Sequence, residues 1–261
     1  MIKKIKIRSA VILCGGRGSR LGILSKKIPK TLVSVQNKKI IWFIINILKK
    51  NKFNQFILPV GYKAHAIKNF IKKNFKNLKN IEIIDTGLNS SIASRIYKIK
   101  NYIKSSNFLL LNGDAIFDFD INQIYKKHVK NNYIMTFVSA PTRANFGTIG
   151  TQNKKIINFQ RDFKFNYVKS KYKQKLKNYV YSGISIMNKV ALNKNFKKYK
   201  NFEQKLYPWI IKKFKCNVEE LNGFFHSIDN QKDIYTVNSI KSENSSYLKV
   251  KNIINYIIKT K

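Results

Sequence analysis

The chain has 261 residues, of which 44% are hydrophobic and 13% aromatic, values typical of a globular protein and not of a disordered chain. Its formal net charge is +40, but the basic residues are spread from Lys3 to Lys261, which argues against a dedicated nucleic-acid-binding module. Cys14 and Cys216 are the only cysteines, which excludes a disulfide framework and a Cys-based zinc site.

Apolar runs in the first half alternate with basic segments of helical period. Such alternation predicts right-handed βαβ crossovers and a Rossmann-like α/β fold, with a mostly parallel mixed sheet and flanking helices. We expect strands at Ser9–Cys14, Gln55–Gly61, Ile81–Asp85 and Phe108–Asn112, and helices at Lys39–Lys50, His65–Phe75 and Ile92–Ile103.

The pattern changes near Tyr133. Shorter strands are expected at Ile134–Ser139, Thr148–Thr151, Lys155–Gln160 and Tyr179–Met187, and closing helices at Asp233–Ser242 and Ser246–Ile258. The Lys-rich stretch 167–178 is interpreted as a solvated loop, with a mobile cationic lid as the alternative. We predict one domain over 1–261, made of two halves at about 1–132 and about 133–261.

No segment predicts export or a membrane span. The apolar run at Ala10–Cys14 is too short for a signal peptide, and the run at Ile40–Leu48 is about half a membrane span and is flanked by lysines. We therefore expect a cytoplasmic protein, in line with its cysteine usage.

Three glycines lie close together in "AVILCGGRGSRL", directly after the first apolar strand. A glycine-rich loop between a strand and a helical segment presents backbone N–H groups to an anion, and Arg17 and Arg20 add positive charge. Lys30 follows Pro29, whose fixed φ stiffens the approach. The loop is neither a Walker A sequence nor a complete dinucleotide fingerprint.

Acidic residues are scarce, so their positions are informative. Asp114 follows the apolar strand in "FLLLNGD", and Asp229 follows another strand-like run in "GFFHSID". Carboxylates in a phosphate-binding pocket would repel the substrate unless a divalent cation lay between them, and Mg²⁺ commonly uses one or two carboxylates together with substrate phosphates.

Two further observations qualify this interpretation. Asp118 and Asp120 have the spacing of a glycosyltransferase metal motif, but Asp120 followed by Gln123 favours a helix N-cap and capping box. His226, beside two phenylalanines, is interpreted as structural, and His65 and His128 lie in helical patterns without evident partners. No Ser-His-Asp arrangement is indicated.

Together these segments resemble the sugar-1-phosphate nucleotidyltransferases, and most closely the glucose-1-phosphate cytidylyltransferase type. The likeness extends over about residues 9–235, through "AVILCGGRGSRL", "IPKTLVSV", "VGYKAHAIKNFI", "IDTGLNSSIASRIYKIKNYI", "NGDAIFDFDI", "RANFGTIG", "YSGISIMNK", "FEQKLYPWI" and "GFFHSIDNQKD". The resemblance implies attack of a sugar 1-phosphate oxygen on the α-phosphorus of a nucleoside triphosphate, most simply CTP and a hexose 1-phosphate, with release of pyrophosphate and no protein nucleophile.

The resemblance also implies a nucleotide-binding half at about 1–132, a sugar-phosphate-binding half with the C-terminal helices at about 133–261, and roles for individual residues. Arg20, Lys30 and Asp114 would be catalytic, and Asp114 and Asp229 would bind Mg²⁺. The sugar phosphate would contact Arg161, Gly183 and Asp229. The nucleotide would contact Leu13, Cys14, Gly15, Gly16, Gly18, Arg20, Lys30 and Gly113.

Two positions depart from the family pattern. Ala93-Ser94-Arg95 replaces a glycine pair before arginine, and "NFQRDF" offers Arg161 and Asp162 in place of a Glu-Lys-Pro segment, so that Lys164 or a lysine of 169–177 is an alternative acceptor ligand. The alternatives for function are a mannose- or heptose-1-phosphate guanylyltransferase, a metal-dependent glycosyltransferase using Asp118 and Asp120, and a nucleic-acid-binding module. The expected partners are a nucleoside triphosphate and a sugar 1-phosphate; assembly into a homo-oligomer is left open.

Overall fold

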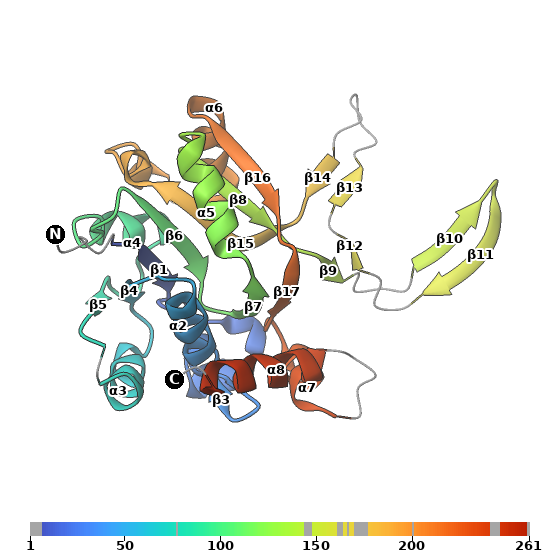
Figure 1. The fold of residues 1–261 in the computed structure, drawn as a ribbon, viewed down its shortest axis with the longest axis horizontal. Helices are drawn as coiled ribbons and strands as arrows, with labels where there is room; N and C mark the ends of the chain where they lie inside the picture. Colours follow the sequence, from blue (N-terminus) through green and yellow to red (C-terminus); the bar gives the residue numbers. More distant parts are fainter. Residues whose placement is uncertain are drawn as a thin grey trace.

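The centre of the structure is a mixed β-sheet (Figure 1). The structure is a computed structural model that describes residues 7–76, 78–143, 148–160, 164–165, 167–169, 177–199, 201–240 and 246–259. Among these residues the sheet has seven strands, in the order β16 (Cys216–Glu220), β8 (Met135–Ser139), β15 (Tyr181–Asn188), β6 (Asn107–Asn112), β1 (Ser9–Leu13), β4 (Gln55–Val60) and β5 (Ile81–Asp85). Only β15 runs antiparallel to its neighbours, so the expected α/β fold with a mostly parallel sheet is confirmed.

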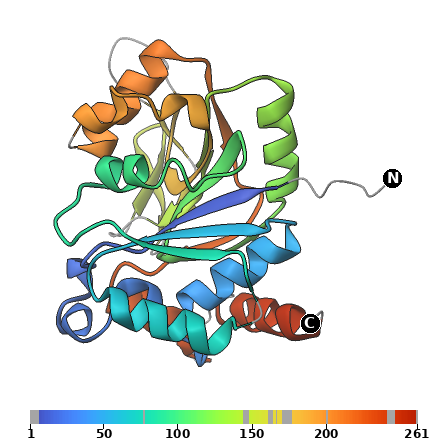
Figure 2. The same ribbon diagram turned by 90° about the vertical axis from the view of Figure 1, so that its left-hand side faces the viewer.

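Helices cover both faces of the sheet because β1 is apolar on both sides. Ala10 and Ile12 of β1 belong to one buried cluster, whereas Val11 between them belongs to another. The first cluster includes residues of α2 (Ile40–Lys50), α3 (Ala64–Asn74), α5 (Ile121–Lys130), α7 (Gln231–Asn238) and α8 (Ser246–Lys259). The second includes residues of α4 (Ile92–Lys98) and α6 (Tyr207–Lys213). Figure 2 shows α2, α3 and α8 below the sheet and α4 and α6 above it.

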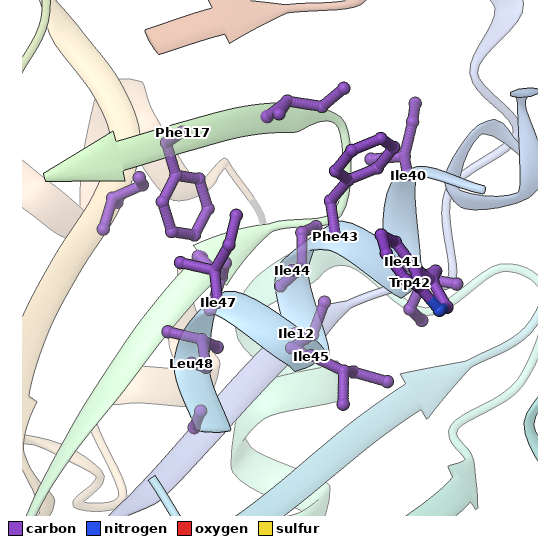
Figure 3. Close-up of a cluster of buried hydrophobic side chains, with 14 of the residues drawn as sticks. Ile12, Ile40, Ile41, Trp42, Phe43, Ile44, Ile45, Ile47, Leu48 and Phe117 are labelled. Atoms are coloured by element: carbon purple, nitrogen blue, oxygen red, sulfur yellow. The ribbon is translucent and has the colours of Figure 1, made fainter. Parts of the chain in front are cut away.

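Helix α2 is buried along nearly its whole length. Every residue from Ile40 to Leu48 is buried, because α2 lies between Ile12 of the sheet and Phe117 of β7 (Ala115–Phe119) (Figure 3). A helix with apolar residues on all sides belongs inside a protein or a bilayer, and here the protein interior encloses it. Among the described residues, no helix has the length and apolarity needed to span a membrane.

Strand β7 pairs with a strand from far along the chain. It runs antiparallel to β17 (Gly223–Ser227), with Ser227 opposite Ala115. The Ile228 N–H then donates to the Asp114 carbonyl over 2.8 Å. This pairing brings the segment after β17 beside the carboxyl end of β6.

Several element ends differ from the sequence prediction. Helix α4 ends at Lys98 and not at Ile103, although Ile99 and Ile103 remain buried; the chain turns after Lys98 while its apolar side chains keep contact with the core. The strand predicted at Tyr179–Met187 is interrupted at Val180, giving β14 (Lys177–Tyr179) and β15. The helix predicted at Asp233–Ser242 is α7, which begins and ends earlier.

Short antiparallel pairs make up the middle of the chain. These are β10 (Thr148–Gln152) with β11 (Lys155–Gln160), β9 (Thr142–Arg143) with β12 (Lys164–Phe165), and β13 (Tyr167–Lys169) with β14. The predicted loop or lid at 167–178 therefore begins and ends in paired strands, and its middle, 170–176, lies outside the described residues.

The remaining elements are short. They are α1 (Ile23–Lys27), the pair β2 (Ser34–Val35) and β3 (Lys38–Lys39), the 3₁₀ turns Ser19–Leu21, Lys30–Leu32, Lys189–Ala191 and Phe196–Lys198, and the π-helical turn Phe202–Leu206.

Candidate active site

The glycine-rich loop lies where the sheet changes its winding direction. It follows β1, whose two parallel neighbours are β4 and β6. Crevices beyond the carboxyl ends of strands at such a point are the usual ligand sites of open α/β sheets. A cavity of about 590 Å³ opens here and is lined by residues 13–20, Lys30 and Thr31, residues 88–92, Arg95, and residues 112–114.

The side chain of Arg95 packs against the glycine-rich loop. Its side chain is buried and donates to the Val60 carbonyl over 3.0 Å, to Thr86 Oγ1 over 2.7 Å and to the Leu88 carbonyl over 3.0 Å. A Cβ atom at Gly15 would lie 2.4 Å from Arg95 Nη1. Gly15 is therefore required for the close approach between the loop and the guanidinium.

Lys30 brings two distant carboxylates together. Its Nζ atom donates to Asp114 Oδ2 over 2.9 Å and to Asp229 Oδ1 over 2.8 Å. Arg20 Nη1 lies 3.1 Å from the same Asp229 oxygen, but the Arg20 side chain is 79% exposed whereas that of Lys30 is 15% exposed. The two acids, 115 positions apart, thus meet beside the glycine-rich loop, as the sequence analysis expected.

Within this cluster, Lys30 and Asp229 each favour their charged form. Burial lowers the pKa of Lys30, but the charge of Asp114 and the hydrogen bonds with both carboxylates outweigh it, and the pKa is raised overall. Burial raises the pKa of Asp229, but the hydrogen bond and charge of Lys30, with Ser227 and Arg20, lower it overall. The Asp229 carboxylate is therefore ionised at neutral pH and is paired with the cationic side chains of Lys30 and Arg20.

A second cavity shares Arg20 with the first. Its volume is about 870 Å³, and Arg20 and Asp229 are part of its wall. The wall also contains Asp118 from β7 and Lys249 from α8. Together the two cavities can accommodate two ligands that meet at the Lys30 cluster.

The remaining predicted residues are placed as follows. Leu13, Cys14, Gly16 and Gly18 line the 590 Å³ cavity, as does Gly113, whose N–H donates to the Leu13 carbonyl over 3.2 Å. Burial raises the pKa of the Cys14 thiol, which is 3% exposed. Gly183 has a φ of +78° in β15 and faces Asn112, whose Nδ2 would lie 2.6 Å from a Cβ atom there. Arg161 lies outside the described residues, and Lys164 lies in β12.

Asp120, His226 and His128 have structural contacts. Asp120 caps α5 by accepting from the Gln123 N–H over 3.0 Å, which confirms the N-cap prediction. His226 is buried and stacks on Phe224 with an interplanar angle of 12°. His128, for which the sequence indicated no partner, contacts Thr136 Oγ1 over 2.8 Å and Asn107 Oδ1 over 3.1 Å.

The sequence analysis missed part of the cavity wall. Arg95 was noticed only as a departure from a family motif, and Thr31, Asn112 and residues 88–92 were not assigned. The Ser91 side chain, which caps α4 by accepting from the Ser94 N–H, was the local signal for a helix beginning at this edge.

The sheet with a glycine-rich loop at its switch point defines an open, doubly wound α/β fold, and the comparisons with known proteins agree. The chain belongs to the nucleotidyl transferase family, whose model matches residues 9–250. This confirms the resemblance found in the sequence.

Individual relatives differ in name and in extent. The chain is 30% identical to the Bacillus subtilis protein named "Probable glucose-1-phosphate cytidylyltransferase", over 55% of this chain and 65% of that protein, so the match spans slightly less than two thirds of that relative. It is 29% identical to the D-glycero-alpha-D-manno-heptose 1-phosphate guanylyltransferase of Campylobacter jejuni, over 87% of this chain and 96% of that protein. The crystal structure of HddC from Yersinia pseudotuberculosis shares the fold, with a TM-score of 0.65 and 20% identity over 88% of this chain and 97% of that chain.

Proposed function

We propose that the protein transfers a nucleotidyl group from a nucleoside triphosphate to a sugar 1-phosphate and releases pyrophosphate. The observation that carries this proposal is the Lys30 cluster, in which two carboxylates and two cationic side chains meet between two cavities beside a glycine-rich loop. Such a site suits a reaction whose substrates carry many negative charges, because catalysis then consists of positioning and charge neutralisation.

The reaction needs no protein nucleophile. An oxygen of the sugar phosphate, already anionic, forms the new bond to the α-phosphorus, and the bond between the α-phosphorus and the bridging oxygen breaks, so that pyrophosphate leaves with the electron pair. In this proposal the loop N–H groups and Lys30 bind the triphosphate, and exposed Arg20 holds the leaving phosphates. The 590 Å³ cavity takes the nucleotide, and the acceptor binds in the 870 Å³ cavity, whose wall contains Asp229. Gly183 and Arg161 remain the acceptor ligands that the family resemblance proposes.

Asp114 and Asp229 fit a bound Mg²⁺. Their two oxygens already share a cationic group, the Lys30 ammonium, and Mg²⁺ is commonly held by two carboxylates together with substrate phosphates. Among the described residues no group of three or more His, Cys, Asp or Glu side chains could hold a metal without a substrate, so phosphate oxygens would have to complete the ligand set. When bound, Mg²⁺ would supply charge neutralisation on the phosphates.

CTP is the proposed nucleotide and a hexose 1-phosphate the proposed acceptor, within the synthesis of a surface polysaccharide precursor in the cytoplasm. The similarity to named glucose-1-phosphate cytidylyltransferases supports this choice. The alternative is a guanylyltransferase acting on a heptose or mannose 1-phosphate, which is supported by the similarity to the Campylobacter jejuni guanylyltransferase over nearly the whole of that protein.

The test is an assay of pyrophosphate release with Mg²⁺, each of the four common nucleoside triphosphates and a panel of sugar 1-phosphates. We expect release with CTP and a hexose 1-phosphate, and release with GTP and a heptose 1-phosphate would favour the alternative. No release with any pair would refute the proposed reaction.

Matched variants separate this reaction from glycosyl transfer. Asp114→Asn removes a carboxylate from the Lys30 cluster, whereas Asp118→Asn removes one from the neighbouring cavity wall. We expect Asp114→Asn to lower kcat/KM by 10²-fold or more, a scale typical of removing one preorganised charged contact, and Asp118→Asn to change it only mildly. The reverse result would favour a glycosyltransferase with Asp118 at its metal.

A further inference from the structure

Lys30 lies where a divalent cation would bridge Asp114 and Asp229. Its Nζ atom is 2.9 Å from Asp114 Oδ2 and 2.8 Å from Asp229 Oδ1. Mg²⁺ contacts carboxylate oxygens at about 2.0–2.1 Å, so an ion shared by these two oxygens would need the space that the ammonium fills. The ammonium and the ion therefore exclude each other.

Both carboxylate oxygens of Asp229 are already engaged. The Oδ1 atom accepts from Lys30 and Arg20, and the Oδ2 atom accepts from the Ser227 hydroxyl over 2.9 Å. The side chains of Lys30, Asp114 and Asp229 are 15%, 24% and 33% exposed, so solvent screens their pairing only in part. A cation that takes Asp229 as a direct ligand has to compete with these partners.

The Lys30 cluster is electrically neutral in the free protein. It combines the carboxylates of Asp114 and Asp229 with the cationic side chains of Lys30 and Arg20. A neutral cluster attracts a divalent cation weakly, whereas the same two carboxylates without the Lys30 ammonium attract it strongly. The net charge of +40 on the chain adds to the repulsion. These charges disfavour Mg²⁺ binding to the free protein.

The 590 Å³ cavity offers the Lys30 ammonium a second position. Lys30 and Gly18 both line this cavity, and a Cβ atom at Gly18 would lie 3.0 Å from Lys30 Cβ, so the base of the side chain packs on the glycine-rich loop. The Lys30 backbone is fixed in a 3₁₀ turn, in which the Val33 N–H donates to the Lys30 carbonyl over 3.1 Å. Because the lysine side chain is long and flexible, its ammonium can turn from the carboxylates to a phosphate in this cavity without backbone movement.

We propose that Lys30 closes the Asp114–Asp229 pair to Mg²⁺ in the free protein, and that a nucleoside triphosphate opens the pair by drawing the ammonium to its phosphates. This inference rests on the proposed function, because it takes the triphosphate as the ligand of the 590 Å³ cavity. The metal and the nucleotide then bind with positive coupling, and each raises the affinity of the protein for the other by the same factor.

The first test measures Mn²⁺ binding to the full chain without nucleotide, from the loss of the paramagnetic resonance signal of the free ion. Mn²⁺ is a suitable probe because it prefers the same oxygen ligands as Mg²⁺. We expect Lys30→Met to bind Mn²⁺ about 30-fold more tightly than the unaltered protein, or more, because it loses a unit charge in direct contact with both oxygens. Equal affinity in the two proteins would overturn the proposal.

Arg20→Met is the matched control. It removes the same charge from the same Asp229 oxygen, but the Arg20 side chain is 79% exposed, so the Mn²⁺ affinity should change by no more than about 3-fold. Equal gains in Arg20→Met and Lys30→Met would show a general effect of charge and refute the role of Lys30. Adding Asp114→Asn to Lys30→Met should abolish the gain, and a retained gain would place the ion elsewhere and refute the proposal.

Thermal melts test the dependence on nucleotide. At about 10 mM Mg²⁺ without nucleotide, we expect the Tm of Lys30→Met to rise by about 5 °C and that of the unaltered protein by less than about 1 °C. The unaltered protein should respond to Mg²⁺ only with CTP or GTP present. An unaltered protein that Mg²⁺ alone stabilises as much as Lys30→Met would overturn the proposal. The melts also show whether each variant folds, and Lys30→Gln replaces Lys30→Met if the latter does not.

These tests separate the role of Lys30 from the proposed reaction, because none of them contains a sugar 1-phosphate or requires turnover. Pyrophosphate release by the unaltered protein, together with unchanged Mn²⁺ affinity in Lys30→Met, refutes the inference about Lys30 alone. Tighter Mn²⁺ binding by Lys30→Met, without pyrophosphate release from any substrate pair, supports the competition between Lys30 and the metal and refutes the reaction.

Discussion

Gly15→Ala tests whether Arg95 supports the glycine-rich loop. Gly15 does not have a positive φ, so alanine fits the backbone, and the cost comes from the side chain. The new Cβ atom would lie 2.4 Å from Arg95 Nη1 and 2.5 Å from its Cζ atom. Contacts this short force either the loop or the guanidinium to move.

The structure sets the size of the effect. Overpacking a tight contact costs about 1–3 kcal/mol. Displacing the guanidinium instead would weaken three hydrogen bonds made by a charged donor, each worth about 1.5–3 kcal/mol. Because the protein takes the less costly route, we expect Gly15→Ala to lower the free energy of unfolding by about 2–3 kcal/mol and the Tm by about 5–10 °C.

The neighbouring glycine provides a matched control. A Cβ atom at Gly16 would meet no atom within 4 Å, and Gly16 does not have a positive φ either. Gly16→Ala should therefore be neutral or stabilising by up to about 1 kcal/mol. Urea denaturation and thermal melts measure both variants.

A double-mutant cycle identifies Arg95 as the contact. Arg95→Met keeps an unbranched side chain but removes the guanidinium, so Gly15→Ala should cost less than about 1 kcal/mol in that background, a coupling of at least about 1 kcal/mol. The explanation fails if Gly15→Ala and Gly16→Ala behave alike, or if the costs of Gly15→Ala and Arg95→Met simply add.

Three further predictions concern side chains outside the loop. Burial lowers the pKa of His128 to about 4, below its unfolded value near 6.5, so the folded state binds fewer protons than the unfolded state. The contribution of His128 to the free energy of unfolding is therefore complete above pH 6.5 and falls by about 3 kcal/mol as the pH drops towards 4. Urea denaturation at several pH values should show a smaller pH dependence in His128→Gln. Asp120→Ala removes the N-cap of α5 and should cost about 1 kcal/mol in urea denaturation, and an unchanged midpoint would show that the cap is energetically unimportant. Cys14 is 3% exposed and burial raises the pKa of its thiol, so it should react slowly. A thiol reagent followed by absorbance should modify the partly exposed Cys216 first, and Cys14 only as fast as the protein opens. Rapid modification of Cys14 in the folded state would contradict its burial.

Local patterns were sufficient for the central elements. The apolar run of β1, the buried helical run Ile40–Leu48 and the N-cap at Asp120 each depend on residues adjacent in the chain, so periodicity and capping chemistry predicted them. The end of α4 was predicted too late because Ile99 and Ile103 stay in the core after the helix has stopped, and an apolar period reports burial and not backbone conformation.

Long-range contacts were only partly predictable. The resemblance to the family implied that Asp114 and Asp229 share one site, but the pairing of β7 with β17 that brings them together joins segments more than a hundred positions apart and has no local signal. The buried position of Arg95 depends in the same way on Val60, Thr86 and Leu88, which come from two other strand ends. A basic side chain does not by itself indicate burial, because isolated charges are rarely buried.

The antiparallel pairing of β7 with β17 has a consequence for synthesis of the protein. A chain still attached to the ribosome can form β1, β4 and β6 early, and with them the glycine-rich loop, but Asp229 reaches Lys30 only after Ser227 has aligned with Ala115. The earlier strands can therefore fold while the Lys30 cluster is still incomplete, and the cluster forms only once the segment after β17 has docked.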